Sequence, residues 1–389
     1  MTILYVCNKD PRLTTGGNEQ RTHSLWMALQ KLGRVYTIVY SNVNGETYKR
    51  IDGENPISIV PTNVARYNHS IRGATYAFLY RKIGFAILPY SYPCERRPSD
   101  VYNIHFDIVV SRYIQNTARY HLWKVAPTIV DIDDHPIQVL ETTRLGQLPR
   151  IMRPFFHFVA EQQFRALLKR IKGGWLANRE QIAPDQNLIQ YLPNIPQYPS
   201  SNYRANSTSR DCLFTIGAMS YEPNHFGVDR FLTNVWPAFH KEFPNIRYVI
   251  GGRGAPEELA NKWNSIEGVE YVGFIENLEE MYERCIATVV PIYSGGGTCI
   301  KTLESLAFSR VCLSTIFGLR GLERQSVESK GLFVFDDEKS FIRQYEKIAS
   351  IEDMSVLETT ARCYVGQNFS MDAFEKNVEK LINEYTCQK

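Results

Sequence analysis

The sequence predicts an α/β protein built from two doubly wound domains that face a central cleft. Three observations predict this fold class. Short apolar runs alternate with helical patterns, a polar stretch at 197–210 interrupts the alternation, and the same alternation then starts again. Strands separated by helical patterns are typical of βαβ units, which build a parallel sheet covered by helices. At 389 residues the chain is also too long for one ordinary core.

The first half, residues 1–196, is expected to form an N-terminal Rossmann-like domain. Each predicted strand is a short apolar run that ends in polar residues, and a glycine turn at Gly16 and Gly17 precedes the first predicted helix. The predicted strands are 3–6, 35–40, 57–60, 107–111 and 128–131, and the predicted helix spans 19–31.

Residues 197–210 are polar, contain proline and lack periodicity, so they are predicted to be an interdomain linker. The C-terminal domain is expected over 211–369. A last helical pattern, 371–385, falls in the segment 370–389 beyond the second sheet and can pack on either domain, including back on the first. In the second domain the predicted strands are 213–216, 247–250, 270–272, 287–293 and 311–315, and the predicted helices are 226–241 and 278–285.

Composition excludes several classes of protein. A net charge of +3 is too small to indicate nucleic-acid binding. The 8 cysteines are scattered without metal-site spacing, which favours buried thiols in a reducing cytoplasm. The first residues form a strand pattern rather than a signal peptide, and no uninterrupted apolar stretch has the length of a membrane span. We therefore expect a cytoplasmic location.

One segment has an unusual charge distribution. Residues 55–94 contain no Asp or Glu, while basic and aromatic side chains alternate along them. Such a segment, 64–97, can lie on an anionic membrane, with rings at the interface and cations on headgroups. An amphipathic helix with a solvated basic face explains the pattern equally well. Both interpretations stay open, and the first would place the protein at the inner face of the membrane.

A glycine-rich loop that leads into a helix is the most informative motif. Glycines allow backbone N–H groups to approach phosphate oxygens, and the helix N-terminus adds its positive end. A lysine in the first turn can add a charge, and a glutamate three residues later lies on the same helix face, where it can accept hydrogen bonds from a ribose. The loop follows a buried strand, so it is expected at the carboxyl edge of a parallel sheet. The residues are Gly295, Gly296, Gly297, Thr298, Lys301 and Glu304.

With these segments the chain resembles the retaining nucleotide-sugar glycosyltransferases of the GT-B fold, glycosyltransferase family 4, also described as glycosyl transferases group 1. The resemblance covers nearly the whole second half and is thinner in the first. The segments that carry it are 216–224, 250–254, 272–275, 295–307, 314–315 and 318–322.

The resemblance implies roles for individual residues on the donor side. The carboxylate that holds the donor ribose falls on Glu304, and Gly296 stands where the family has its first motif glutamate. The loop after the first donor-domain strand lacks the usual cations and offers Asn224 instead. Diphosphate charge is then expected to meet Lys301, the helix end and Arg253 or Arg320. Donor binding is further expected at Phe274, Gly16, Gly17, Gly295, Gly297 and Thr298, with no metal and no cofactor.

On the acceptor side the implied residues are Arg21 and Arg112. A solvent-exposed helix arginine is the alternative for Arg21. Two more candidates, Asp134 and His135, follow a predicted strand and are expected to position acceptor or sugar hydroxyls. Asp131 and Asp133 point the same way by strand alternation, as in a metal-binding Asp-x-Asp, while helix capping before Pro136 is an equal alternative for Asp133 or Asp134.

The resemblance thus implies a retaining glycosyltransferase that uses a UDP or GDP type nucleotide sugar and a glycan or lipid-linked glycan acceptor. Asp134, His135 and Lys301 are the expected catalytic residues. A GT-B sugar-nucleotide epimerase and a non-catalytic nucleotide-binding relative are the alternatives. A dinucleotide-dependent dehydrogenase is disfavoured because no G-x-G-x-x-G follows the first strand.

Overall fold

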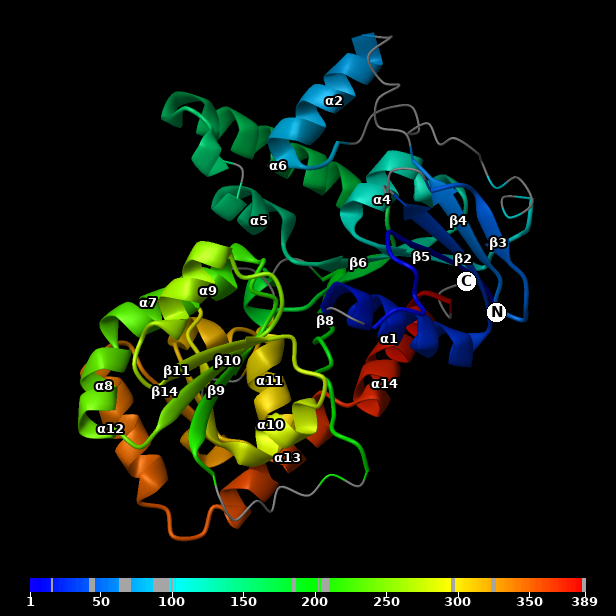
Figure 1. Ribbon diagram of the computed structural model, residues 1–389. Coiled ribbons are helices and arrows are strands. Elements are labelled where there is room, and N and C mark those ends of the chain that lie inside the picture. The colour runs from blue at the N-terminus through cyan, green and yellow to red at the C-terminus, as the bar shows by residue number, and fades with distance from the viewer. Residues whose placement is uncertain are drawn as a thin grey trace. The chain divides into compact units, whose positions relative to one another are not determined.

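The computed structural model describes residues 1–14, 17–41, 46–62, 71–86, 98, 101, 103–143, 145–183, 187–201, 203, 210–294, 298–322 and 327–386. The chain forms two compact units, each built on a wholly or mostly parallel sheet with flanking helices (Figure 1). Unit 1 is Met1–Asn194 with Met371–Lys389, and unit 2 is Ile195–Ser370. The predicted fold class, with two α/β domains, is confirmed. The C-terminal segment belongs to unit 1.

The sheet of unit 1 has the strand order β3-β4-β2-β1-β5-β6-β7-β8. All neighbouring strands are parallel except β3, which pairs antiparallel with β4. The strands are β1 (Thr2–Cys7), β2 (Arg34–Ser41), β3 (Lys49–Ile51), β4 (Ile57–Pro61), β5 (Ile108–Arg112), β6 (Thr128–Asp133), β7 (Gly173–Leu176) and β8 (Ile189–Tyr191). The helices are α1 (Gly17–Leu32), α2 (Ile71–Ile83), α4 (Ile114–Tyr120), α5 (Pro136–Thr143), α6 (Arg153–Leu168) and α14 (Met371–Thr386).

Helix α14 closes unit 1 by packing beside α1, far from it in sequence (Figure 1). Its buried face consists of Phe374, Val378, Leu381 and Ile382, at helical spacing. An ion pair of 2.5 Å between Lys31 Nζ and Glu375 Oε2 joins the exposed edges of the two helices. The last helix therefore completes the core of the unit that contains the first strand.

The sheet of unit 2 is parallel throughout, with the order β11-β10-β9-β12-β13-β14. The strands are β9 (Cys212–Ile216), β10 (Arg247–Gly251), β11 (Val269–Gly273), β12 (Cys285–Val290), β13 (Cys312–Ser314) and β14 (Leu332–Val334). The helices are α7 (Glu222–Asn234), α8 (Trp236–Glu242), α9 (Glu257–Asn264), α10 (Leu278–Arg284), α11 (Ile300–Ala307), α12 (Glu338–Ala349) and α13 (Ser355–Asn368).

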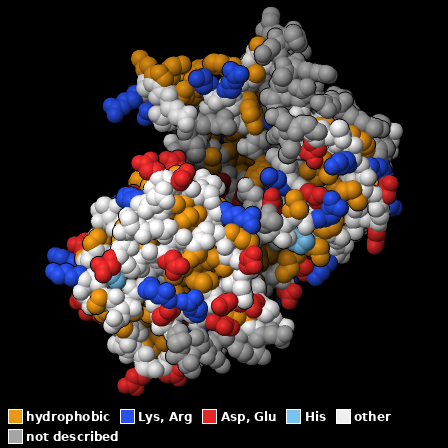
Figure 2. Space-filling view, viewed as in Figure 1, with side chains coloured by type: hydrophobic (Ala, Val, Ile, Leu, Met, Phe, Trp, Pro, Cys, Tyr) orange, Lys and Arg blue, Asp and Glu red, His pale blue; other side chains and the backbone are white. Residues whose placement is uncertain are grey.

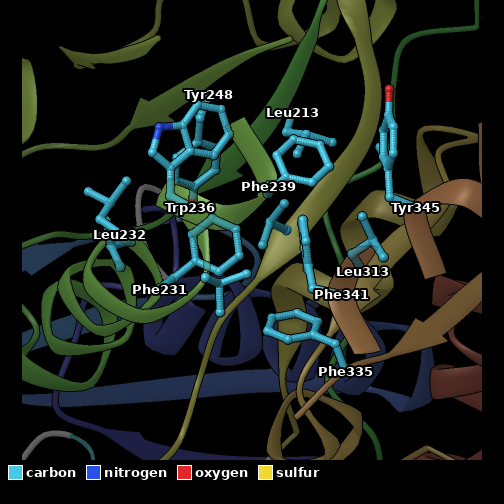
Figure 3. Packing of buried hydrophobic residues seen from close by; sticks show 14 of the residues in the cluster. Leu213, Phe231, Leu232, Trp236, Phe239, Tyr248, Leu313, Phe335, Phe341 and Tyr345 are labelled. Carbon is cyan, nitrogen blue, oxygen red and sulfur yellow. The ribbon is translucent and has the colours of Figure 1, made fainter. Parts of the chain in front are cut away.

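Aromatic side chains fill one face of this sheet (Figure 3). Phe239 of α8 lies 5.2 Å from Phe341 and 4.9 Å from Tyr345, ring centroid to ring centroid, in both cases edge to face. Phe231 of α7 approaches Phe341 to 5.0 Å in the same arrangement. Such geometry places the positive ring edge on the negative ring face. The packing fixes α7, α8 and α12 on the sheet.

The predicted helix 226–241 is wrong, because two helices occupy this stretch and the first of them begins earlier, at Glu222. Helix α7 ends at Asn234 and α8 begins at Trp236 with a proline in its first turn. Pro237 has no N–H to donate and its ring would clash with the preceding turn, so one helix cannot run through it. The predicted strand 287–293 likewise ends early, at Val290, because Pro291 follows.

Part of the predicted linker is packed rather than solvated. Tyr203 is buried in the second core cluster of unit 2, and its hydroxyl donates to the Phe308 carbonyl at 3.0 Å. None of the helices in the described part of the chain has both the length and the apolarity needed to cross a bilayer.

Candidate functional site

Three loops meet at the carboxyl edge of the unit 2 sheet, after β9, β10 and β11. The Gly217 N–H donates to the Gly251 carbonyl at 3.2 Å, and the Met219 N–H donates to the Arg253 carbonyl at 2.8 Å. Gly252 has φ +123°, and a Cβ there would lie 1.6 Å from the Gly217 carbonyl oxygen. Only glycine allows this approach. The glycine turn that the sequence singled out therefore joins the loops into one surface.

Lys301 reaches these loops from helix α11. Its Cε lies 2.6 Å from the position that a Gly217 Cβ would occupy. The Asn224 amide lies 3.1 Å from the same position and donates to the Ala218 carbonyl at 2.7 Å. Asn224 is buried and closes the loop after β9. The structure thus brings Lys301 and Asn224, two predicted donor-site residues, against one glycine.

Glu304 follows Lys301 by one helical turn and is held by Tyr282 of α10. The Tyr282 hydroxyl donates to Glu304 Oε1 at 2.9 Å, and its buried ring stacks on Phe308 at 4.1 Å. Burial raises the pKa of Glu304 to about 7, against the opposing effects of the Tyr282 hydroxyl and Lys301. Half of these carboxyl groups are therefore protonated near neutral pH, which makes Glu304 sensitive to any ligand that donates hydrogen bonds to it.

Arg253 and Phe274 form a stacked pair beside the glycine turn. The guanidinium carbon lies 3.7 Å from the centroid of the Phe274 ring. More than half of the Phe274 side chain is exposed, although it is large and apolar. A cation over an aromatic face is an attractive contact that keeps both groups at the surface. Two residues predicted separately for donor binding are thus neighbours.

The end of the glycine-rich loop, at Thr298 and Cys299, packs against the loop after β13. Thr298 is buried, and a Cβ on Gly321, which has φ +81°, would lie 2.7 Å from the Thr298 Oγ1. The Cys299 N–H donates to the Arg320 carbonyl at 3.3 Å, and the Thr302 hydroxyl donates to the Gly318 carbonyl at 2.6 Å. The predictions for Gly16, Gly295, Gly296 and Gly297 fall outside the described residues.

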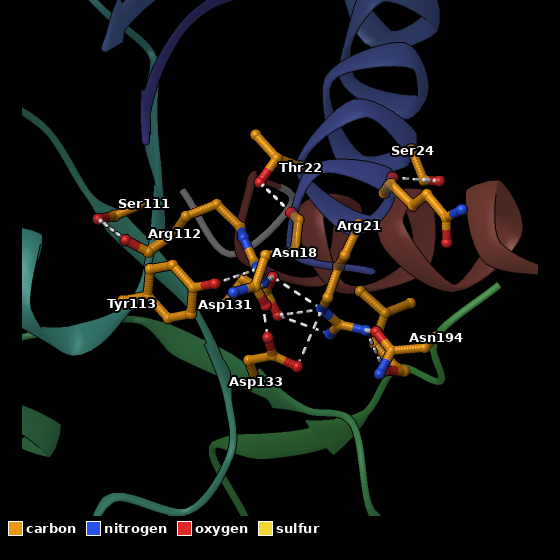
Figure 4. Close-up of polar contacts among 12 residues, drawn as sticks. Asn18, Arg21, Thr22, Ser24, Ser111, Arg112, Tyr113, Asp131, Asp133 and Asn194 are labelled. Atoms are coloured by element: carbon orange, nitrogen blue, oxygen red, sulfur yellow. Dashed lines mark hydrogen bonds and ion pairs between the residues drawn. The ribbon is translucent and has the colours of Figure 1, made fainter. Parts of the chain in front are cut away.

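A second polar cluster lies at the carboxyl edge of the unit 1 sheet (Figure 4). Asp131 is fully buried between two guanidinium groups: Arg21 Nη2 lies 2.6 Å from Asp131 Oδ1, and Arg112 Nη1 lies 2.5 Å from Asp131 Oδ2. Arg21 also donates to the Leu192 carbonyl and the Asn194 side chain, both at 2.9 Å. Arg21 and Arg112 are themselves buried, so the exposed-helix alternative for Arg21 is wrong.

The same cluster holds the strand ends in unusual backbone geometry. Tyr113 and Asp133 have φ +63° and +68°, in the left-handed region that non-glycine residues seldom adopt. Arg112 Nη2 donates to the Tyr113 hydroxyl at 2.8 Å and to Asp133 Oδ2 at 3.2 Å. The two arginines lower the pKa of Asp131 despite its burial. They therefore act as a clamp on the turn that leads to Asp134 and His135.

His135 lies at the start of α5 with its ring edge against Phe164, at a centroid distance of 5.2 Å. Burial lowers the pKa of His135, so the imidazole is neutral at pH 7. Its Nδ1 is buried and makes no hydrogen bond within the part of the chain that the structure describes. Asp134 is adjacent and partly buried. A neutral imidazole with a free ring nitrogen can exchange a hydrogen bond with a hydroxyl group.

Both carboxylates of the Asp-x-Asp pattern form ion pairs with arginines. Asp131 and Asp133 do point the same way, as strand alternation predicts, but toward Arg112 and Arg21. Across the described ranges no group of three or more His, Cys, Asp or Glu side chains is arranged to hold a metal ion. Gly17, the other half of the predicted N-terminal glycine turn, is the exposed first residue of α1.

Two features of these clusters could not be predicted from local sequence: the hydrogen bond from Tyr282 to Glu304 and the pairing of Asp131 with both arginines. Tyr282 lies 22 positions before Glu304, and Asp131 lies 110 positions after Arg21, so no local motif links the partners. For Tyr282, the local sequence shows an apolar helix face with one tyrosine, and this pattern is also typical of core packing.

The family model described as glycosyl transferases group 1 matches residues 210–350. Sucrose-phosphate synthase from Thermosynechococcus elongatus is similar in structure, with 13% identity, a TM-score of 0.68 and 100% of each chain covered. No curated protein sequence matches the chain.

Two further solved structures share the fold. A trehalose-6-phosphate synthase from E. coli, bound with UDP-2-fluoro glucose, has 10% identity and a TM-score of 0.61, covering 98% of this chain and 99% of that one. WaaG, a glycosyltransferase involved in lipopolysaccharide biosynthesis, has 12% identity and a TM-score of 0.55, covering 97% and 99%. At these identities the structural likeness shows the GT-B fold.

Proposed function

We propose that this chain, whose residues 210–350 match the family model of the glycosyl transferases group 1, is a glycosyltransferase that transfers a sugar with retention at the anomeric carbon. The donor is a UDP or GDP type nucleotide sugar, and the acceptor is a hydroxyl of a glycan or of a lipid-linked glycan. A donor of the UDP type is supported by the E. coli structure that binds UDP-2-fluoro glucose on the same fold.

The observation that carries this proposal is the pairing of Lys301 and Glu304 on helix α11. Lys301 extends over Gly217 at the carboxyl edge of the sheet, while Glu304, one turn on, is held by the Tyr282 hydroxyl. A nucleoside diphosphate needs a cation at its phosphates and an acceptor of hydrogen bonds at its ribose. The α11 N-terminus adds a positive dipole end, and its N-cap residue, Cys299, makes no side-chain hydrogen bond to the first-turn N–H groups.

Bond breaking in this proposal depends on stabilising the leaving diphosphate. The bond from the anomeric carbon to the diphosphate oxygen breaks, and the acceptor oxygen then bonds to that carbon on the same face. A β-phosphate oxygen takes the acceptor proton. Lys301 and the backbone N–H groups at the start of α11 meet the charge that develops, with Arg253 or Arg320 as further cations. Fixed charges and dipoles aimed at such a site supply the largest catalytic contribution in many enzymes.

Asp134 and His135 are proposed to position hydroxyl groups of the sugar or the acceptor. The neutral His135 ring, with a buried Nδ1 that has no partner within the described residues, supports this role. Arg21 and Arg112 act on this side through Asp131 and Asp133 rather than as free cations. They are positioning residues in this proposal.

The nucleobase of the donor is proposed to lie near the Arg253 and Phe274 pair. The exposed Phe274 ring and the guanidinium stacked on it offer a flat, apolar surface at the edge of the glycine turn. No metal or cofactor is required by this proposal, because Lys301 and the helix end supply the positive charge.

Contact with an anionic membrane through 64–97 is also proposed, since it would bring the protein to a lipid-linked acceptor at the inner membrane face. Trypsin digestion with and without anionic vesicles tests it. Protection of Arg66, Arg72 and Arg81 is expected, and unchanged cleavage at these sites would contradict it.

A thermal-shift panel tests the donor site. UDP, GDP, CDP, ADP and NAD are compared with and without Mg²⁺ on the wild type and on Glu304→Ala. We expect one diphosphate to stabilise the wild type independently of metal, and the variant to lose most of that effect. Stabilisation by NAD alone, or by none of the nucleotides, would overturn the proposal. Nucleotide binding without turnover of any sugar donor would indicate a non-catalytic relative.

A further inference from the structure

The C-terminal end of α11 turns the chain so that Arg310 lies next to α10. Ser309 has φ +56°, its N–H donates to the Leu306 carbonyl at 3.0 Å, and the Arg310 N–H donates to the Ser305 carbonyl at 2.8 Å. These two bonds form a Schellman motif, in which glycine is the usual residue at the left-handed position. The motif fixes where the Arg310 side chain begins, six residues after Glu304.

The Arg310 guanidinium donates to the end of α10. Its Nε lies 2.5 Å from the Tyr282 carbonyl oxygen, and its Nη2 lies 3.4 Å from the Glu283 carbonyl oxygen. Helix α10 ends at Arg284, so both carbonyls are in its last turn, where backbone acceptors have no partner within the helix. A cation at this end also meets the negative end of the helix dipole. Arg310 therefore holds the C-terminus of α10.

Glu358 of α13 orients the same guanidinium. Its Oε1 lies 3.0 Å from Arg310 Nη1 and 2.5 Å from Arg210 Nη1. On the face of unit 2 seen in Figure 2, Lys, Arg, Asp and Glu side chains are scattered over the surface, whereas Arg310 is 0% exposed and Glu358 is 6% exposed. A buried ion pair adds little net stability compared with well-packed apolar residues. What this pair supplies is a fixed direction for the Arg310 donors.

Tyr282 is held at its backbone, its ring and its hydroxyl. The carbonyl accepts from Arg310, the ring stacks on Phe308 at a centroid distance of 4.1 Å, and the hydroxyl donates to Glu304 Oε1 at 2.9 Å. Glu304, Phe308 and Arg310 all belong to α11 or to the turn that ends it. The direction of the Tyr282 hydroxyl therefore depends on how Arg310 fixes the end of α10.

We propose that Arg310 is a positioning residue for the donor site, which fixes the end of α10 so that the Tyr282 hydroxyl donates to Glu304. Arg310 acts through Tyr282, and Glu358 acts through Arg310. The inference deepens the proposed function and rests on it only for the ligand that Glu304 holds.

Titration of Glu304 reports on this arrangement. Burial raises the pKa of Glu304 to about 7, while the Tyr282 hydroxyl and Lys301 oppose that effect. Burial raises the pKa values of the neighbouring Cys285 and Cys312 thiols to about 12 and that of the Tyr282 phenol well above its usual value. These three groups therefore stay neutral between about pH 5 and 9. Loss of the hydrogen bond from Tyr282 must raise the pKa of Glu304.

Carbon-13 NMR of protein labelled at its glutamate carboxyl carbons follows this titration without any ligand. The Glu304 signal is assigned by its absence in Glu304→Gln. The test variants are Arg310→Met, Tyr282→Phe and the two combined. The matched control is Phe341→Leu, which truncates a buried side chain in the separate aromatic cluster of unit 2 (Figure 3).

We expect the midpoint of Glu304 to rise by about one pH unit in Arg310→Met and in Tyr282→Phe, because each loses one hydrogen bond to a carboxylate. The combined variant should show no further rise, since Arg310 acts through the Tyr282 hydroxyl. Phe341→Leu should lower the unfolding temperature and keep the wild-type midpoint. Arg310→Lys should give a smaller rise, because one ammonium group replaces the planar fork, and it provides the test if Arg310→Met does not fold.

An unchanged midpoint in the Arg310 variants would overturn the proposal. A combined variant whose rise equals the sum of the two single rises would also overturn it, because Arg310 would then act on Glu304 by its charge alone. A rise in Phe341→Leu as large as that in Arg310→Met would show a general effect of lost stability and would contradict the proposal as well.

Calorimetry with UDP-glucose and GDP-mannose connects this arrangement to the donor. The affinity of Arg310→Met for the nucleotide sugar that binds should fall about fivefold at pH 7 and recover near pH 9, where Glu304 is ionised again. A loss of the same size at both pH values would contradict the positioning role. A wild type that binds neither nucleotide sugar would contradict the proposed function and leave the NMR result intact.

Discussion

At the scale of single residues, the environment of Glu304 governs how the donor site responds to pH. The carboxyl group has a pKa of about 7 because burial disfavours its charge, and only the Tyr282 hydroxyl and Lys301 oppose this effect. Ribose hydroxyls donate to a carboxylate more strongly than to a neutral acid. Donor affinity should therefore depend on the ionised form of Glu304.

We expect the affinity for the nucleotide sugar to fall as the pH decreases below about 7, by up to about tenfold per pH unit, because protonation competes with binding. Titration calorimetry between about pH 5.5 and 8.5 measures this, with a nucleotide sugar rather than a free diphosphate, whose terminal phosphate titrates near pH 6.

Two variants separate Glu304 from other titrating groups. Glu304→Gln should bind more weakly and lose the pH dependence. Tyr282→Phe should move the midpoint to higher pH, because it removes a hydrogen bond that lowers the pKa of Glu304. A Glu304→Gln profile that keeps the wild-type slope would refute this assignment.

The buried clamp in unit 1 yields a stability prediction. Arg112→Met should lower the free energy of unfolding by about 3 to 5 kcal/mol at pH 7, because Asp131 loses one of its two cations inside the protein. Arg50→Met, which breaks an exposed pair with Asp52, is the control and should cost less than about 1 kcal/mol. Urea unfolding measures both differences.

The sign of the pH effect follows from the lowered pKa of Asp131. The stabilisation is present above the unfolded pKa of about 4 and is lost as the pH falls through the lower folded value. The gap between wild type and Arg112→Met should therefore shrink in acid. A gap that widens as the pH falls would contradict the ionised state of Asp131.

At the scale of elements, the glycine turn after β10 is required by its geometry. Gly252→Ala should abolish most nucleotide binding, because the new Cβ would collide with the Gly217 carbonyl and displace the loop that Lys301 contacts. Gly273→Ala is the matched control, since it has φ +68° but meets nothing within 4 Å.

The control should cost only about 1 kcal/mol of stability from backbone strain and should retain binding. Calorimetry of both variants, together with their melting temperatures, decides between the two effects. Equal binding losses in the two variants would show that strain, rather than the collision at Gly217, is responsible.

Local sequence could predict the strands that are continuous apolar runs and the glycine turns beside them. It could not predict β7, where Gly173 and Gly174 start a strand of four residues, because two glycines weaken the strand pattern. Helix α6 was also missed, since Phe155 and Phe158 face outward while Phe156 faces the core. A helix with apolar residues on opposite faces has no single amphipathic stripe.

For the site, local motifs could predict Lys301, Glu304 and the glycine turns but not what holds them. The roles of Tyr282 and Asp131 arise from partners distant in the chain, which only the folded structure brings together. The prediction for Arg21 named the residue but not its burial, because one arginine in a helix has the same local pattern in either environment.

At the scale of the whole molecule, the C-terminal helix ties the last residues of the chain to the unit that contains the first. Leu381→Ala, which truncates a fully buried side chain on α14, should destabilise unit 1 by about 2 to 5 kcal/mol. Unit 2 should keep its nucleotide affinity, because α14 packs in unit 1.

Hydrogen exchange with mass spectrometry measures this, since it reports each unit separately. Faster exchange is expected in β1 and α1, with unchanged exchange in β9 and β12. Equal acceleration in both units would show that they unfold as one body.

The central claim is that a nucleotide sugar binds to unit 2 through the loops after β9 and β10 and the start of α11. Hydrogen exchange with and without the nucleotide that stabilises the protein tests it most directly. The account predicts protection of peptides covering 217–224, 251–254 and 298–304, and its loss in Glu304→Gln at the same nucleotide concentration. Protection confined to unit 1, or protection of these peptides that Glu304→Gln leaves unchanged, would contradict it.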